Sequence, residues 1–142
     1  MFDDLHMALV RAFHAQKNRT RPGMMKIGLS PGQPKVLLYV SRHNRCMQRE
    51  IAEALDIEPA TVSQLLNNMA QSGLIRRSEP GERRRAEAVS ITDKGLAACE
   101  QWKLLCAEIE EESLAGFSEE ERERFLSYLC RMYRNLTGKP LE

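Results

Sequence analysis

The sequence of 142 residues has little of what several classes of protein require. Aromatic residues make up 6% of the chain, which suits a helical protein better than a sandwich of strands. No apolar run approaches the length of a transmembrane helix, and the first residues lack the basic start and apolar stretch of a signal peptide. We therefore expect a cytoplasmic protein with no membrane partner, organised as a single domain over residues 1–142.

The side-chain constellations that carry enzyme chemistry are also missing. The four cysteines form no Cys-x-x-Cys pair, and the three histidines lack the close spacing of metal ligands. No Ser-His-Asp or Cys-His arrangement, phosphate-binding glycine loop or paired carboxylate site stands out. We expect no enzyme, no catalytic residue, no metal and no cofactor. Oxidant sensing by Cys46, Cys99, Cys106 or Cys130 stays open, but packing as small hydrophobes is favoured.

Charge is balanced overall but unevenly distributed. The formal net charge is +1, yet residues 1–49 carry nine Lys or Arg against two Asp or Glu. Residues 50–75 carry four acids and no base, and residues 76–85 carry five Arg and two Glu. Local positive patches on a nearly neutral chain are compatible with a DNA-binding face.

Hydrophobic periodicity and capping signals predict a mainly α fold with one small β-hairpin. Helices are expected over 5–17, from Ser30 onward, over 48–55 and 59–72, from Asp93 to about Leu114, and after Ser118. Gln33 can reach back to Ser30, Thr92 can cap the helix that starts near Asp93, and Ser118 and Glu121 fit a capping box. Pro22-Gly23 is assigned to a loop after the first helix. Strands are expected over 74–78 and 86–91, joined by a charged turn. This order predicts a winged helix-turn-helix over 30–92, flanked by apolar terminal helices.

The helix at 59–72 carries the clearest functional signal. In a helix-turn-helix the second helix enters the major groove, and its outward side chains meet base edges. Small or uncharged polar side chains of this kind can bond to bases or touch a thymine methyl. A merely polar surface helix is the alternative, but such a helix usually carries Glu and Lys pairs. The outward positions here are Ala60, Thr61, Ser63, Gln64, Asn67 and Asn68.

Arginines mark the predicted hairpin. Arg83, Arg84 and Arg85 lie at its tip, and Arg76 and Arg77 lie on its incoming strand. Arginine at such a tip suits a narrow minor groove or phosphate contact. A solvated charge run is the alternative explanation, and position directly after a helix-turn-helix favours the DNA contact.

Four short motifs stand out in the middle of the chain: Gln48-Arg49-Glu50-Ile51-Ala52-Glu53-Ala54-Leu55, Ala60-Thr61-Val62-Ser63, Gly73-Leu74-Ile75-Arg76-Arg77 and Ile91-Thr92-Asp93-Lys94-Gly95. Together they resemble the multiple antibiotic resistance regulator (MarR) family. The resemblance implies a homodimer made by helices within 1–20 and 93–137, bound to a pseudo-palindrome in double-stranded DNA. It also implies transcriptional regulation, usually repression that is released by a small-molecule effector or by oxidation. Gln48, which opens the first motif, joins the predicted DNA contacts.

Two positions depart from the family pattern. Family wings usually show Asp-x-Arg at the tip, and here Arg85 matches the Arg but Arg83 occupies the Asp position. Glu82 lies one residue early. Met47 stands where the family usually has a Thr or Ser helix cap, which costs about 1 kcal/mol of local helix stability at most.

Three further interpretations stay open. A winged-helix protein-interaction module would predict acidic or bulky apolar residues on the outer face of 59–72. A thiol-based redox regulator of the same fold would need a reactive cysteine, but no cysteine precedes Cys46, so the family's peroxide-sensing mechanism does not carry over. Trp102, Met24 and Met25 either line an effector pocket or serve as packing.

Overall fold

The computed structural model describes residues 4–78 and 88–141, and its contacts fall into two compact units. The first unit comprises residues 1–107 and the second residues 108–142. The sequence predicted a single domain over residues 1–142. Among the described residues, no helix combines the length and apolar character needed to cross a membrane.

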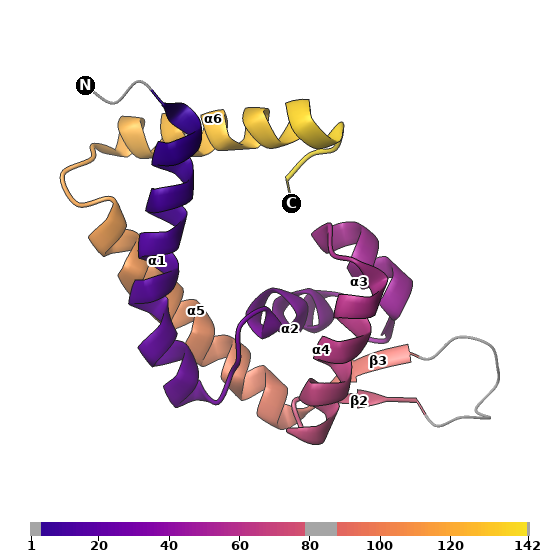
Figure 1. Cartoon of the computed structure of the whole chain (residues 1–142). Helices are drawn as coiled ribbons and strands as arrows, with labels where there is room; N and C mark the ends of the chain where they lie inside the picture. The colour runs from indigo at the N-terminus through magenta and orange to yellow at the C-terminus, as the bar shows by residue number, and fades with distance from the viewer. Residues whose placement is uncertain (1–3, 79–87, 142) are drawn as a thin grey trace. The chain divides into compact units, whose positions relative to one another are not determined.

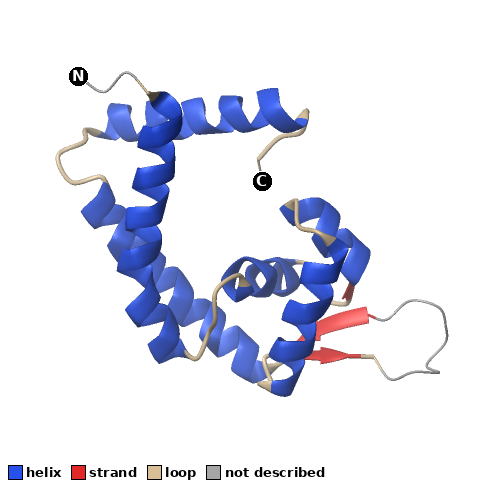
Figure 2. Cartoon of the chain, in the orientation of Figure 1, coloured by secondary structure: helices blue, strands red, loops and turns tan. Residues whose placement is uncertain are grey.

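The first unit contains a helix-turn-helix followed by a strand hairpin (Figure 1). This matches the predicted mainly α winged fold. The strands, red in Figure 2, lie beside α4. The elements are α1 (Leu5–Ile27), α2 (Gln33–Arg42), β1 (Cys46–Met47), α3 (Gln48–Leu55), α4 (Pro59–Gln71), β2 (Ile75–Arg77), β3 (Ala88–Ile91) and most of α5 (Asp93–Ser113).

One buried cluster joins α2, α3, α4 and the sheet. Each helix contributes the stripe that its 3.6-residue period predicts, and the largest side chains of the cluster are almost fully removed from water. Trp102 of α5 packs against this cluster, as its core interpretation predicted. Burial of such side chains is the main stabilising contribution to the fold. The cluster includes Val36, Leu37, Val40, Ile51, Val62, Leu66, Met69, Leu74 and Val89.

The sheet has three antiparallel strands in the order β1-β3-β2. Ile75 lies opposite Ile91 and Arg77 opposite Val89, while Val89 also pairs with Cys46 of β1. The hairpin strands were predicted, although the described strands are shorter than the predicted ranges 74–78 and 86–91. Strand β1 was missed because two residues are too short to show a period of two.

The prediction for the first helix was wrong at its end. Helix α1 runs on to Ile27, through Pro22 and Gly23, where the sequence predicted a loop from residue 18. Gly23 lies so close to Leu105 that a Cβ added to the glycine would come within 2.8 Å of the Leu105 methyl carbons. The next residue, Met24, is buried. Packing therefore outweighs the hydrogen bond lost at Pro22. The helix ends at Gly28, whose φ of 93° is left-handed.

Helix α2 begins later than predicted. Gly32, with a left-handed φ of 86°, is its N-cap, so the helix cannot include Pro31. The predicted contact between Gln33 and Ser30 is nevertheless present. Gln33 Oε1 accepts a hydrogen bond of 3.0 Å from the Ser30 amide. Helix α4 ends at Gln71, and Gly73 follows with a φ of 79°, as expected for the residue after a C-cap.

The start of α5 is tied to the end of α4 by polar contacts. The Thr92 hydroxyl lies 2.6 Å from the Gly73 carbonyl oxygen and 3.0 Å from that of Leu74, and it accepts a hydrogen bond from the Gly95 amide. Lys94 Nζ donates to the Ser72 carbonyl at 2.6 Å. These bonds satisfy carbonyls just past α4 and cap α5 as predicted at Thr92.

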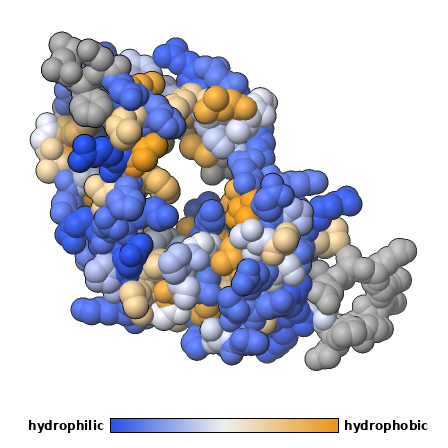
Figure 3. Space-filling model, in the orientation of Figure 1, coloured by the Kyte–Doolittle hydropathy of each residue, from blue (hydrophilic) through white to orange (hydrophobic). Residues whose placement is uncertain are grey.

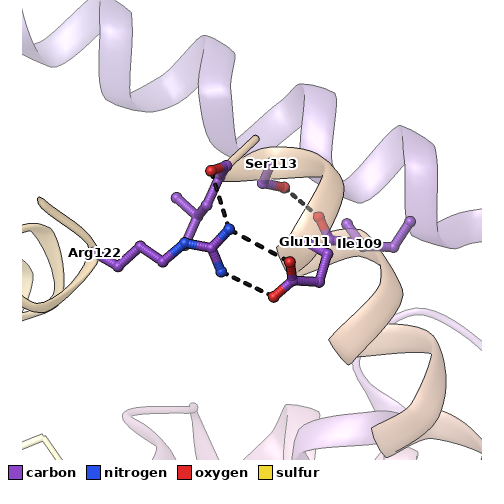
Figure 4. A network of polar contacts seen from close by, with 5 residues as sticks. Ile109, Glu111, Ser113 and Arg122 are labelled. Carbon is purple, nitrogen blue, oxygen red and sulfur yellow. Dashed lines mark hydrogen bonds and ion pairs between the residues drawn. The ribbon is translucent and has the colours of Figure 1, made fainter. Parts of the chain in front are cut away.

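The second unit is stabilised by helix caps and by an ion pair between α5 and α6. Helix α6 (Glu119–Thr137) begins at Ser118, which exchanges hydrogen bonds with Glu121 in the predicted capping box. Arg122 donates to both Glu111 carboxylate oxygens and to the Leu114 carbonyl, while the Ser113 hydroxyl donates to the Ile109 carbonyl (Figure 4). These hydrogen bonds from Arg122 hold the pKa of Glu111 below its usual value.

We predict that Gly95→Ala destabilises the protein by about 1–3 kcal/mol, the usual cost of overpacking. A Cβ at Gly95 would overlap the Leu74 backbone carbonyl oxygen, which cannot move without breaking the contacts to Thr92. Urea unfolding monitored by circular dichroism measures the change. Gly23→Ala is the control, because its Cβ would meet the flexible end of Leu105. Equal losses for the two variants would contradict this explanation.

We also predict that Glu111→Gln lowers the thermal midpoint at neutral pH but not at acidic pH. The folded-state pKa of Glu111 is lowered by Arg122, so its contribution is present above the unfolded pKa and is lost as pH falls through the folded one. Thermal melts across a pH series measure this. Glu108→Gln, an exposed change on the same helix, is the control for the loss of one negative charge. A gap between wild type and Glu111→Gln that persists in acid would contradict the ion-pair explanation.

Candidate nucleic-acid interface

The turn between α3 and α4 is short and internally fixed. Asp56 ends α3 in the left-handed region, with a φ of 56°, and the Ile57 amide donates to the Ala52 carbonyl at 3.1 Å. Pro59 then occupies the first turn of α4, where its missing N–H costs no hydrogen bond. The Glu50 carboxylate accepts from the Met47 amide, so the capping interaction works without a Thr or Ser at residue 47.

Helix α4 presents an uncharged polar face opposite its buried one. Val62, Leu66 and Met69 are fully buried, and no residue of α4 carries a charge. Figure 3 shows mainly hydrophilic surface over the region of α4 and β2. The predicted outward positions fall on this face: Ala60, Thr61, Gln64, Asn67 and Asn68 are exposed, and Ser63 is half-buried.

Arg77 connects three elements of this region. From β2, its Nη1 donates to Asn67 Oδ1 of α4 at 2.6 Å and its Nη2 donates to Gln48 Oε1 of α3 at 2.8 Å. Gln48 Nε2 in turn donates to the Pro59 carbonyl at 3.3 Å. Three residues predicted as DNA contacts thus hydrogen-bond to one another. Sequence reasoning missed this network, because Arg77 lies 29 residues from Gln48 along the chain.

The remaining predicted arginines divide into two groups. Arg76 is exposed on β2, opposite Ser90 of β3, and alternation along the strand places its side chain on the face opposite that of Arg77. Arg83, Arg84 and Arg85 lie outside the described residues, as does Glu82. Asn44, which was not predicted, accepts a hydrogen bond from the Ile91 amide at 3.0 Å and ties the end of the central strand β3 to the segment before β1.

The cysteines are placed poorly for thiolate chemistry. Cys46 and Cys99 are buried, and this burial raises the pKa of both thiols. The Cys99 thiol lies 3.7 Å from the Leu37 carbonyl oxygen inside the core. Cys106 and Cys130 are half-buried. Across the described ranges, no group of three His, Cys, Asp or Glu side chains is arranged to hold a metal ion.

A hollow of about 340 Å³ lies at the end of α1. Met24 and Met25 both line it, together with Arg21 and the segment that leads to α2. Trp102 does not line this hollow. Both lie within α1, and Met24 also belongs to the buried cluster, so it serves as packing as well. The full lining is Arg21, Met24, Met25, Gly28, Leu29, Ser30 and Pro31.

Comparison with known proteins gives consistent matches. A family model described as "MarR family" matches residues 27–86. The Bacillus subtilis (strain 168) transcriptional repressor MdtR is 28% identical over 67% of this chain, which spans 61% of that protein's length. The uncharacterized regulator YwoH from the same organism is 31% identical, with 75% of this chain and 76% of YwoH covered.

Solved structures extend the match to the whole chain. The crystal structure of the S. aureus MepR–DNA complex is 27% identical and covers 93% of this chain and 96% of that one, with a TM-score of 0.78. The transcriptional regulator SlyA, 22% identical, shares the fold with a TM-score of 0.85 over 94% of each chain. Together with the family model and YwoH, these matches show that the chain belongs to the MarR family.

Proposed function

We propose that this chain is a sequence-specific DNA-binding transcriptional regulator, and that α4 is its recognition helix. The observation that carries the proposal is the exposed, uncharged face of α4, held rigidly by the α3–α4 turn. A polar face without charge leaves amides and hydroxyls available for base edges. Similarity to MepR, solved as a DNA complex, supports the DNA partner. Similarity to the repressor MdtR supports repression.

The contacts divide by chemistry. In this proposal Ala60, Thr61, Ser63, Gln64, Asn67 and Asn68 face the major groove, with Gln48 at the adjoining end of α3. Arg76 supplies positive charge from the exposed face of β2 for the phosphate backbone, and Arg77 hydrogen-bonds to Asn67 from the other face. Arg83, Arg84 and Arg85 act as wing contacts on the sequence argument alone. Base contacts set sequence preference, and arginine–phosphate contacts set affinity and its salt dependence.

The regulator acts as a homodimer in this proposal. Apolar side chains are exposed in both units: Leu5 and Phe13 on α1 are 72% and 60% exposed, and Leu126 and Leu136 on α6 are 59% and 76% exposed. Large exposed apolar side chains gathered on terminal helices are typical of protein interfaces. Two copies related by a two-fold axis would read a pseudo-palindromic operator with half-sites about one helical turn apart.

Release of the operator by a small-molecule effector completes the proposal. The hollow at the end of α1 supports it, because two flexible methionines and one arginine can accommodate an apolar ligand that carries a negative group. The thiol-based alternative has less support, since burial raises the pKa of the Cys46 and Cys99 thiols and so disfavours the reactive thiolate. The protein-interaction alternative lacks the acidic or bulky apolar face on α4 that it requires.

The test of this proposal is titration of a fluorescein-labelled duplex that carries the promoter region of the chain's own gene. A scrambled duplex of equal length serves as the comparison, over a series of salt concentrations. We expect salt-sensitive binding with preference for the promoter duplex and two protomers per site. A failure to bind either duplex at low salt would overturn the proposed function.

We predict that Gln64→Ala reduces the preference for the promoter duplex about tenfold, because one bidentate base contact contributes roughly 1–3 kcal/mol of discrimination. The salt dependence of binding should stay unchanged, since no charge is removed. Fluorescence anisotropy with both duplexes measures the two quantities. Gln71→Ala, an exposed change at the far end of α4, is the matched control and should leave the preference intact. A change in the salt slope alone would argue that Gln64 contacts no base.

A further inference from the structure

A hydrogen bond from Arg77 holds the side-chain amide of Asn67 in one orientation. Its Oδ1 accepts a 2.6 Å hydrogen bond from Arg77 Nη1. A guanidinium has donors and no acceptor, so the atom that faces it must be the carbonyl oxygen of the amide. The Nδ2 group, on the other branch of the amide, is therefore turned away from Arg77. Within residues 4–78 and 88–141, no acceptor bonds to that nitrogen, and Asn67 is exposed.

Arg77 is itself fixed and cannot rotate away without breaking other bonds. Its second terminal nitrogen, Nη2, donates to Gln48 Oε1 at 2.8 Å, and the Gln48 amide is anchored by its own bond to the Pro59 carbonyl. Arg77 is half-buried on β2, between α3 and α4. Two amide oxygens thus hold one guanidinium, and the guanidinium in turn fixes both amides.

Building on the proposed function, we propose that Arg77 is a positioning residue that makes Asn67 a hydrogen-bond donor toward DNA. Asn67 then bonds to an acceptor, either on a base edge or on a phosphate. A bidentate pair with adenine requires the amide to offer both its oxygen and its nitrogen to the base, and Arg77 already takes one of the two acceptor positions of that oxygen and turns it toward β2. Asn68, exposed beside it, has no such bond within the described chain and keeps both groups.

A double-mutant cycle tests the positioning role. Arg77→Lys keeps the charge, but a single ammonium cannot hold two amides in the fixed fork of a guanidinium. We expect Arg77→Lys to weaken promoter binding about tenfold in the wild-type background and by much less in an Asn67→Ala background, where Gln48 is the one amide still affected. Anisotropy titrations measure the four affinities, and circular dichroism melts confirm that each variant is folded. Additive effects of the two substitutions on promoter affinity would overturn the inference. If the wild-type chain binds the promoter duplex in the same titrations, the proposed function still stands.

A second comparison tests the donor directly and does not depend on changing Arg77. Asn67→Asp keeps an oxygen for Arg77 and replaces the donor nitrogen with a second acceptor. Gln71→Glu adds the same charge to an exposed position of α4 and measures the general repulsion from DNA. We expect Asn67→Asp to lose about tenfold more affinity than Gln71→Glu.

The duplexes then separate the two sources of acceptor. An extra loss confined to the promoter duplex assigns the acceptor to a base edge, and an equal extra loss on the scrambled duplex assigns it to a phosphate. Equal losses for Asn67→Asp and Gln71→Glu would overturn the inference. No binding by the wild-type chain to either duplex would instead refute the proposed function on which it rests.

Discussion

The contact between the start of α5 and the end of α4 determines how the rest of the first unit is arranged. The chain leaves α4 at Gly73, enters the hairpin, and returns at Thr92 to the carbonyls that it has just passed. Because Thr92 and Lys94 bond to the carbonyls of residues 72–74, the entry and the exit of the hairpin are fixed at the same place. Gly95 is needed there because the Leu74 carbonyl leaves no room for a side chain.

This contact is what brings the hairpin beside the polar face of α4. With Ile75 opposite Ile91, the register of β2 is set two residues before Arg77, so that the guanidinium lies beside Asn67 and Gln48. A slip of one residue would turn Arg77 to the opposite face of the strand. The orientation of the Asn67 and Gln48 amides therefore depends on backbone contacts at the base of the hairpin.

The sequence predicted what is local and missed what depends on distant contacts. Periodicity located the buried stripe of α4, and the Ser118–Glu121 spacing located the start of α6, since both signals lie within a few residues. The continuation of α1 through Pro22 depends on packing against Leu105, which is 82 residues beyond Gly23, and no local signal reports it. The Arg77 network was likewise invisible, because each of its partners was interpreted separately as a DNA contact.

The distribution of charge agrees with the proposed roles of the two elements, in which the hairpin supplies affinity and α4 supplies sequence discrimination. Helix α4 carries no charge, while Arg76 on β2 and the arginine-rich segment after it supply the positive potential. Electrostatic attraction to phosphates is indifferent to sequence, so a charged recognition helix would raise affinity for every duplex alike. With affinity assigned to the hairpin and discrimination to α4, substitutions on the helix can change the preferred operator without abolishing binding. Asn67 is the exception, because its orientation is set by an arginine of the hairpin, and the two roles meet at that residue.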